Sequence, residues 1–184
     1  MLLTDAQIDA LLCQQPILNE WPWSTNDETI IDNHIKDIVA EVRRKTGVKD
    51  RSEYDHYGSG YASFVDCWLY RPDDDFRYRP GDNYYGLVVL FSRLSNYYVI
   101  GQGEKSWDKT SEAIYLPDFD FVDDIDHQPV AQLAPRVVDI LNQRGLKQLH
   151  KSDLNTILPT DVSVPTILAG RVFHHFDALF YWED

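Results

Sequence analysis

The 184-residue chain carries 17 Lys and Arg against 30 Asp and Glu, which gives a net charge of −13 and a pI of about 4.7. A surface of this sign repels nucleic acid and anionic membranes, which excludes both as partners. The same surface attracts a basic protein, although acidity is also common in proteins that only need to stay dispersed. Apolar residues at 43% and aromatic residues at 13% suffice for the core of a single domain over residues 1–184.

Two capping boxes predict helices near the N-terminus. Thr4 and Gln7 form a T-x-x-Q box, and a helix beginning at Thr4 follows from it. Thr25 and Glu28 repeat the pattern ahead of an apolar row with helical spacing, which predicts a second helix that ends at Gly47. Two tryptophans between these helices flank a proline and are expected to cap the core.

From residue 60 the pattern changes to that of strands. Stretches rich in β-branched and aromatic residues lie at 61–71, 84–94, 96–107 and 112–116. Their short connections favour antiparallel neighbours. We therefore expect an α+β fold, with N-terminal helices in residues 1–50 and, in residues 60–184, an antiparallel sheet of about four or more strands and a C-terminal amphipathic helix packed on the sheet.

The C-terminal amphipathic helix contains a proline. Because an interior proline removes a hydrogen bond and clashes with the preceding turn, we expect the regular helix to start at Pro135 and to end at Gly145, with residues 129–134 in a separate turn. Ser152 is positioned to cap a further short helix that runs through Ile157.

The cysteines and the N-terminus bear on the cellular compartment. Cys13 and Cys67 are far apart and lack CxxC spacing, which favours reduced thiols in a cytosol. The N-terminus has no basic segment ahead of an apolar one, and no stretch of about 18 apolar residues occurs. We expect a soluble, cytoplasmic protein.

The most unusual segment is an acidic stretch with no Lys or Arg. Its five aspartates are Asp118, Asp120, Asp123, Asp124 and Asp126. An EF-hand loop starting at Asp118 fails, because Val122, Asp123 and Pro129 stand where an oxygen ligand, a glycine and a glutamate are required. A looser calcium or magnesium site remains an alternative. Phe119 and Phe121 alternate with the aspartates, which predicts an extended segment with phenylalanines inward and carboxylates outward.

Signals for catalysis are weak. Adjacent acids tend to stay solvated and ionised rather than acquire the raised pKa of a general acid. Cys67 lies in an apolar strand, no G-x-S-x-G occurs, and His56 has no triad partner in its own segment. The glycines at 58–60 and 101–103 are not followed by the helix of a phosphate-binding loop, and both are expected to be turns. No enzyme activity, cofactor or metal is predicted.

Three stretches carry a resemblance to a known group: "YYGLVVLFSRLSNYYVIGQGEKSW" in the sheet, "PVAQLAPRVVDILNQ" in the late helix, and "FDALFYWED" at the end. In the order of their predicted elements and in their types of residue, residues 60–184 resemble immunity proteins of bacterial polymorphic-toxin systems, the SUKH-like and related α+β families. The resemblance implies a non-enzymatic protein that binds one basic cognate toxin domain in the cytosol and neutralises it by stoichiometric binding.

The acidic surface and exposed aromatics would form the interface with this partner. The residues expected to contact it are Asp118, Asp120, Asp123, Asp124, Asp126, a second patch of Asp73, Asp74 and Asp75, and the aromatic residues Tyr97 and Trp107. Two alternatives stay open: a metal-dependent enzyme that uses the aspartates between 118 and 126, and an adaptor domain without a toxin partner.

Overall fold

The computed structural model describes residues 2–58, 60–106, 112–113, 117–166 and 171–183. The main helices are α1 (Asp5–Leu12), α2 (Glu28–Thr46), α3 (Gln128–Gln143), α4 (Lys151–Leu154) and α5 (His175–Leu179), with 3₁₀ turns η1 (Trp23–Thr25), η2 (His56–Gly58) and η3 (Phe119–Phe121). The strands are β1 (Lys49–Glu53), β2 (Tyr61–Ala62), β3 (Phe64–Tyr70), β4 (Arg77–Arg79), β5 (Asn83–Ser92), β6 (Tyr97–Ser106), β7 (Glu112–Ala113), β8 (Lys147–Gln148) and β9 (Trp182–Glu183).

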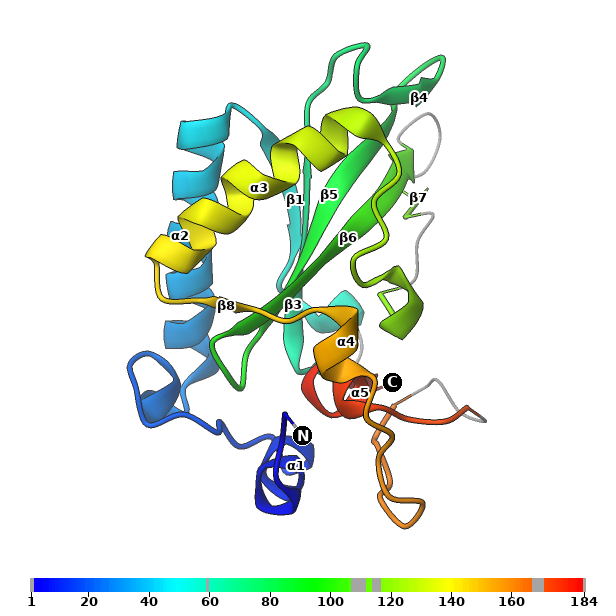
Figure 1. Cartoon of the computed structure of the whole chain (residues 1–184). Helices are drawn as coiled ribbons and strands as arrows, with labels where there is room; N and C mark the ends of the chain where they lie inside the picture. Colours follow the sequence, from blue (N-terminus) through cyan, green and yellow to red (C-terminus); the bar gives the residue numbers. More distant parts are fainter. Residues whose placement is uncertain (1, 59, 107–111, 114–116, 167–170, 184) are drawn as a thin grey trace.

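The fold is α+β, as predicted (Figure 1). Within the described residues, seven strands form one sheet whose main order is β1-β3-β5-β6-β7, with β4 paired to β5 and β8 paired to β6. All pairs in this sheet are antiparallel except β6 with β8, so the sheet is mixed at one edge. β2 and β9 make a separate antiparallel pair that brings the end of the chain beside residues 61–62.

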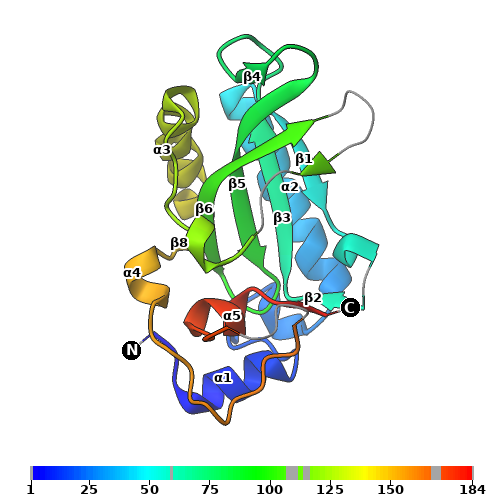
Figure 2. The same ribbon diagram turned by 90° about the vertical axis from the view of Figure 1, so that its right-hand side faces the viewer.

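Helices α2 and α3 cover one face of the sheet, and Figure 2 shows α5 and α1 gathered at one end of it. The Tyr98 hydroxyl donates to Asn142 Oδ1 of α3 at 3.1 Å, which identifies the helix-covered face. Since side chains alternate along a strand, Gly101 of β6 and its partner Val88 belong to the other face, where Phe121 of η3 packs. The core therefore lies on both sides of the central strands.

The outer edge of β6 is covered along its length. β8 pairs with its first residues and β7 with its last. Between them, Asp123 N–H donates to the Ile100 carbonyl and Gln102 N–H donates to the Asp124 carbonyl, both at 2.9 Å. The acidic segment thus completes the edge of the sheet, where unpaired backbone groups would otherwise be exposed.

The first helix is confirmed and the start of the second is corrected. Thr4 caps α1 in the predicted capping box. The cap of α2 is Asp27, whose side chain accepts from Ile30 N–H, while the Thr25 hydroxyl donates to the Pro22 carbonyl. The predicted box fails because Thr25 belongs to η1. α2 ends at Gly47 as predicted, with φ of 74°.

The break predicted at Pro135 is wrong. α3 runs continuously from Gln128 to Gln143 with Pro135 inside it and exposed. Its buried row of Val130, Leu133, Ala134, Val137, Ile140 and Leu141 spans the proline. Keeping this row packed on the sheet outweighs the lost backbone bond. The later short helix is also displaced: α4 is capped by His150 and ends at Leu154, so Ser152 lies inside it.

Two strand features were not predicted. β1, with the charged sequence KDRSE, joins the sheet before residue 60 as an edge strand. The glycines at 101–103 lie within β6 and form no turn. A Cβ on Gly101 would come within 2.3 Å of Phe121, and Trp68 Nε1 donates to the Gly103 carbonyl at 3.1 Å. Gly101 therefore makes room for the Phe121 ring, a requirement that arises from a distant part of the chain.

Candidate binding site

The acidic stretch from 118 to 126, hereafter the acidic edge, includes a 3₁₀ turn and is not fully extended. Asp118 caps η3, and its Oδ1 accepts from the backbone N–H groups of Asp120 and Phe121 at 3.0 and 3.3 Å. Phe121 is buried and Phe119 is half-buried, stacked on His174 at 4.5 Å between ring centroids. The inward direction of the phenylalanines is confirmed, although the local conformation differs.

Asp123 has a structural role. It occupies the left-handed region at φ of 61°, and its two carboxylate oxygens accept from His150 Nδ1 at 3.1 Å and from Lys151 N–H at 2.8 Å. The carboxylate therefore satisfies a backbone donor at the start of α4 and ties α4 to the acidic edge. Asp126 is held in a similar way, because Gln102 Nε2 donates to its Oδ1 at 2.6 Å.

The carboxylates that project most freely are those of Asp120 and Asp124. The side chain of Asp120 is 91% exposed, and its nearest cation is Lys151 Nζ at 3.6 Å. Asp124 and Asp126 are exposed, while Asp118 is half-buried. The acidic edge thus combines carboxylates that hold the local structure with others that face solvent.

The second predicted patch lies next to the acidic edge. His127 Nε2 donates to the Asp75 carbonyl at 2.7 Å, which joins the 73–75 loop to the end of the acidic edge. Its charge is partly offset: Asp74 pairs with Arg77, and Asp75 shares a cavity wall with Arg71 and Arg136. Asp73 Oδ1 accepts from Phe76 N–H at 3.2 Å and shapes the turn. This patch is electrostatically weaker than its sequence suggests.

Of the two aromatic residues predicted to anchor the interface, the structure describes only Tyr97. Tyr97 is half-buried against the core, and Trp107 lies outside the described residues. Trp23 is buried as expected of a residue that caps the core, whereas Trp21 is 63% exposed with its ring edge against His34. Among the tryptophans that the structure describes, Trp21, which was not predicted as an anchor, is the most exposed.

The described residues also bear on metal binding and on membrane insertion. Among the residues that the structure describes, no group of three or more His, Cys, Asp or Glu side chains is arranged to hold a metal ion. None of the helices in the same part of the chain combines the length and apolar character needed to cross a bilayer.

Sequence reasoning missed a buried polar cluster, the Arg93 cluster, in the turn between β5 and β6. Arg93 is 1% exposed and pairs with Asp32 of α2 through Nε and Nη2, at 2.8 and 3.0 Å. Its remaining N–H groups donate to the carbonyls of Tyr54, Ala62 and Phe64 at 2.8 to 2.9 Å. All five donors of the guanidinium are therefore engaged, and one side chain links α2 to Tyr54, to β2 and to the start of β3.

His56 extends this cluster to the surface. Its Nδ1 accepts from Ala62 N–H at 2.8 Å, so the ring proton sits on Nε2, which donates to Glu28 Oε1 at 2.9 Å. His56 and Tyr57 both have positive φ, 53° and 57°. With this backbone conformation the two neighbouring side chains form hydrogen bonds with different residues, His56 with Glu28 and Tyr57 with Asp66. Tyr57 donates to buried Asp66 at 2.8 Å, and burial followed by the Asp66 charge raises the pKa of Tyr57.

Two signals in the sequence point to the Arg93 cluster in retrospect. Asp32 interrupts the apolar row of α2, being seven positions before Val39, and Arg93 stands in a short turn between two apolar strands. A charge in either place needs a partner.

Comparisons with protein-family models, with curated protein sequences and with solved structures give no significant match.

Proposed function

We propose that this protein is a non-enzymatic inhibitor that binds and neutralises a basic partner protein, as the resemblance to toxin-immunity families implies. The observation that carries the proposal is the acidic edge: exposed carboxylates of Asp120 and Asp124 stand on a segment hydrogen-bonded into the sheet. A fixed array of like charges costs little ordering free energy when a cationic surface docks on it.

The wider charge of the chain favours the same function. A net charge of −13 produces a field that accelerates encounter with a basic protein, and the fixed carboxylates then supply charge-assisted hydrogen bonds to Arg or Lys. The exposed Trp21 offers a large aromatic anchor of the kind that dominates interface energies.

Features of the possible catalytic groups also favour binding over catalysis. Both ring nitrogens of His56 are engaged within the protein, so a role as general base would require it to give up a hydrogen bond. Cys67 is buried in β3, and burial raises the pKa of its thiol, which suppresses the nucleophilic thiolate.

The test is co-expression and pull-down with the toxin domain encoded beside this protein, followed by measurement of the association rate constant. Asp120→Lys combined with Asp124→Lys is expected to slow association about tenfold or more at low salt, with a smaller difference at high salt. These two positions are chosen because Asp118 and Asp123 hold backbone groups, and their loss would disturb the fold.

A matched control changes the charge equally on the helix layer: Asp37→Lys with Asp139→Lys, both exposed on α2 and α3. This control is expected to reduce the rate much less. Equal slowing by both pairs would show that only net charge matters, and the absence of any partner or protection would refute the inhibitor function.

A further inference from the structure

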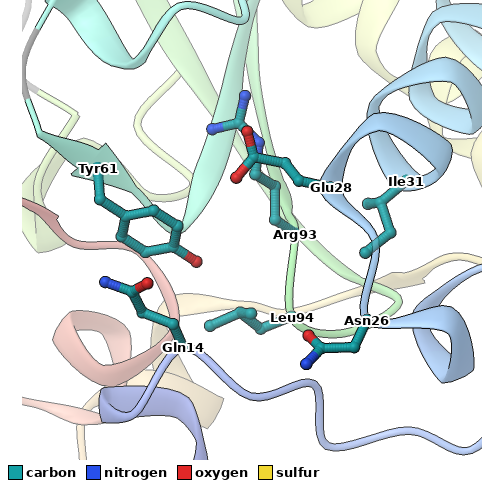
Figure 3. A pocket seen from close by; sticks show the side chains of 7 residues that line it. All are labelled: Gln14, Asn26, Glu28, Ile31, Tyr61, Arg93 and Leu94. Atoms are coloured by element: carbon teal, nitrogen blue, oxygen red, sulfur yellow. The ribbon is translucent and has the colours of Figure 1, made fainter.

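A small cavity opens beside the Arg93 cluster, between the first turn of α2, the end of α1, β2 and the β5–β6 turn. Its volume is about 180 Å³, and Figure 3 shows the residues that line it: Gln14, Asn26, Glu28, Ile31, Tyr61, Arg93 and Leu94. Polar groups come from segments far apart in the sequence, while Ile31 and Leu94 supply an apolar wall. The cavity is therefore a product of the tertiary fold.

The polar lining is rich in acceptors. Gln14 uses its amide nitrogen to donate to Glu183 Oε1 at 3.2 Å, and Asn26 uses its amide nitrogen to donate to Gln15 at 3.1 Å. The amide oxygens of Gln14 and Asn26 are left on the cavity side, as Figure 3 shows. Together with the Glu28 carboxylate they form an oxygen-lined site that needs a ligand with several donors.

The Glu28 carboxylate and the Arg93 guanidinium both line the cavity, but Arg93 is already paired with an opposite charge inside the protein. The guanidinium is paired with Asp32 inside the protein and has all its donors engaged, so it has no N–H group left to donate to a ligand. Glu28 receives a hydrogen bond from His56, and among the described residues no Lys or Arg forms an ion pair with its carboxylate. Glu183, opposite Tyr61 in the β2–β9 pair, lies outside the lining and holds the Gln14 amide group.

Tyr61 reports on this field. Burial is the main cause that raises the pKa of its hydroxyl, followed by Tyr181; the charge of Arg93 lowers this pKa, and the smaller contributions of Glu28 and Glu183 raise it. Its ring also offers a π system to a cation. The lining groups suit a ligand with several N–H donors for the Gln14 and Asn26 oxygens, a positive charge for Glu28 and an apolar stem for Ile31 and Leu94.

We propose that this cavity binds an alkyl guanidinium, supplied by an arginine side chain of the partner. The guanidinium would donate to Glu28 and to the oxygens of Gln14 and Asn26, with the stem against Ile31 and Leu94. The source of the guanidinium rests on the proposed function, whereas the chemistry of the cavity does not. It would give the inhibitor a specific anchor in addition to the less selective acidic edge.

The experiment titrates N-acetyl-arginine-amide into the ¹⁵N-labelled full chain and follows the backbone amide signals of residues 26, 61 and 94 by NMR. Saturable shifts with a Kd in the millimolar range are expected for a single small side chain. N-acetyl-citrulline-amide has nearly the same shape without the charge and is expected to bind at least about fivefold more weakly.

Glu28→Gln keeps an acceptor for His56 and removes the charge, so it is expected to weaken arginine-amide binding by about tenfold while the urea midpoint stays close to that of the wild type. Asp37→Asn is the matched control with the same change in net charge and is expected to bind as the wild type does. Equal binding of arginine and citrulline amides, equal loss in both variants, or non-saturable shifts would overturn the proposal.

The outcomes separate this inference from the proposed function. Saturable, Glu28-dependent binding of arginine-amide supports the cavity even if no protein partner is found. If a basic partner binds through the acidic edge but arginine-amide leaves residues 26, 61 and 94 unshifted, the inhibitor function stands and the guanidinium site is refuted.

Discussion

The buried pair of Arg93 and Asp32 gives the most demanding prediction. Arg93→Met keeps an unbranched side chain but leaves Asp32, 7% exposed, without its cation and three carbonyls without their donor. Removing one partner of a buried ion pair costs about 3–5 kcal/mol, and each buried acceptor left unsatisfied adds about 1–3 kcal/mol. We expect a loss of at least about 4 kcal/mol, a large part of the 5–15 kcal/mol by which domains are stable.

Urea unfolding followed by tryptophan fluorescence and circular dichroism measures this loss. With an m-value of about 2 kcal/mol per M, the midpoint falls by about 2 M. In a thermal scan, about 2–4 °C per kcal/mol for a chain of this size gives a fall of about 8–16 °C. The m-value itself is expected to stay unchanged.

A double-mutant cycle identifies the cause of the loss. Asp32→Asn combined with Arg93→Met is expected to cost clearly less than the sum of the single changes, because the second substitution removes the charge that the first one stranded. Arg144→Met is the control: its ion pair with Glu41 is at the surface, and we expect a cost of about 1 kcal/mol or less. A loss below about 1 kcal/mol for Arg93→Met, or strict additivity of the pair, would refute the role assigned to the Arg93 cluster.

Three further predictions concern packing, thiol reactivity and pH. Gly101→Ala places a methyl group within 2.3 Å of Phe121 and is expected to cost about 1–3 kcal/mol in urea unfolding; wild-type stability would contradict the close approach. Exposed Cys13 is expected to react with a thiol reagent in the native protein, and buried Cys67 only after unfolding, so two reactive thiols per native chain would refute the packing of β3. Burial lowers the pKa of His175 below its ordinary 6.5, so the unfolded state binds the proton more readily and stability falls as the pH drops below 6.5. His175→Asn is expected to flatten the dependence of Tm on pH between about 5 and 7, and an unchanged slope would contradict this.

The parts of the fold that the sequence predicts are those decided locally. The cap at Thr4, the stop at Gly47 and the long apolar strands each depend on residues within one or two turns of the backbone. Asp27 replaced Thr25 as the cap of α2 because two oxygen-bearing side chains compete there, and η1 takes the first. Composition and order were therefore enough for the α+β class.

The errors share a different cause, which is packing between distant segments. Pro135 stays inside α3 because the buried row on both sides of it must reach the same sheet. Gly101 stays in β6 because Phe121 arrives from η3, and β1 is a strand although its sequence is charged, because an edge needs few apolar residues. The Arg93 cluster joins α2 to the β5–β6 turn, 61 positions apart, and no local pattern encodes that pairing.

The aspartates of this chain fall into two structural groups, and this division decides how the proposed function can be tested. Asp32, Asp118 and Asp123 each accept hydrogen bonds that hold a helix, a turn or a buried cation, so their charge belongs to the fold. Asp120 and Asp124 face solvent, where reversal of the charge changes the electrostatic field but leaves those hydrogen bonds intact. A variant with all five aspartates of the acidic edge reversed would detach α4 from the acidic edge and would lose binding whether or not the carboxylates contact a partner. A slower association is evidence for recognition only when the solvent-facing aspartates are changed and the aspartates that hold the fold are kept.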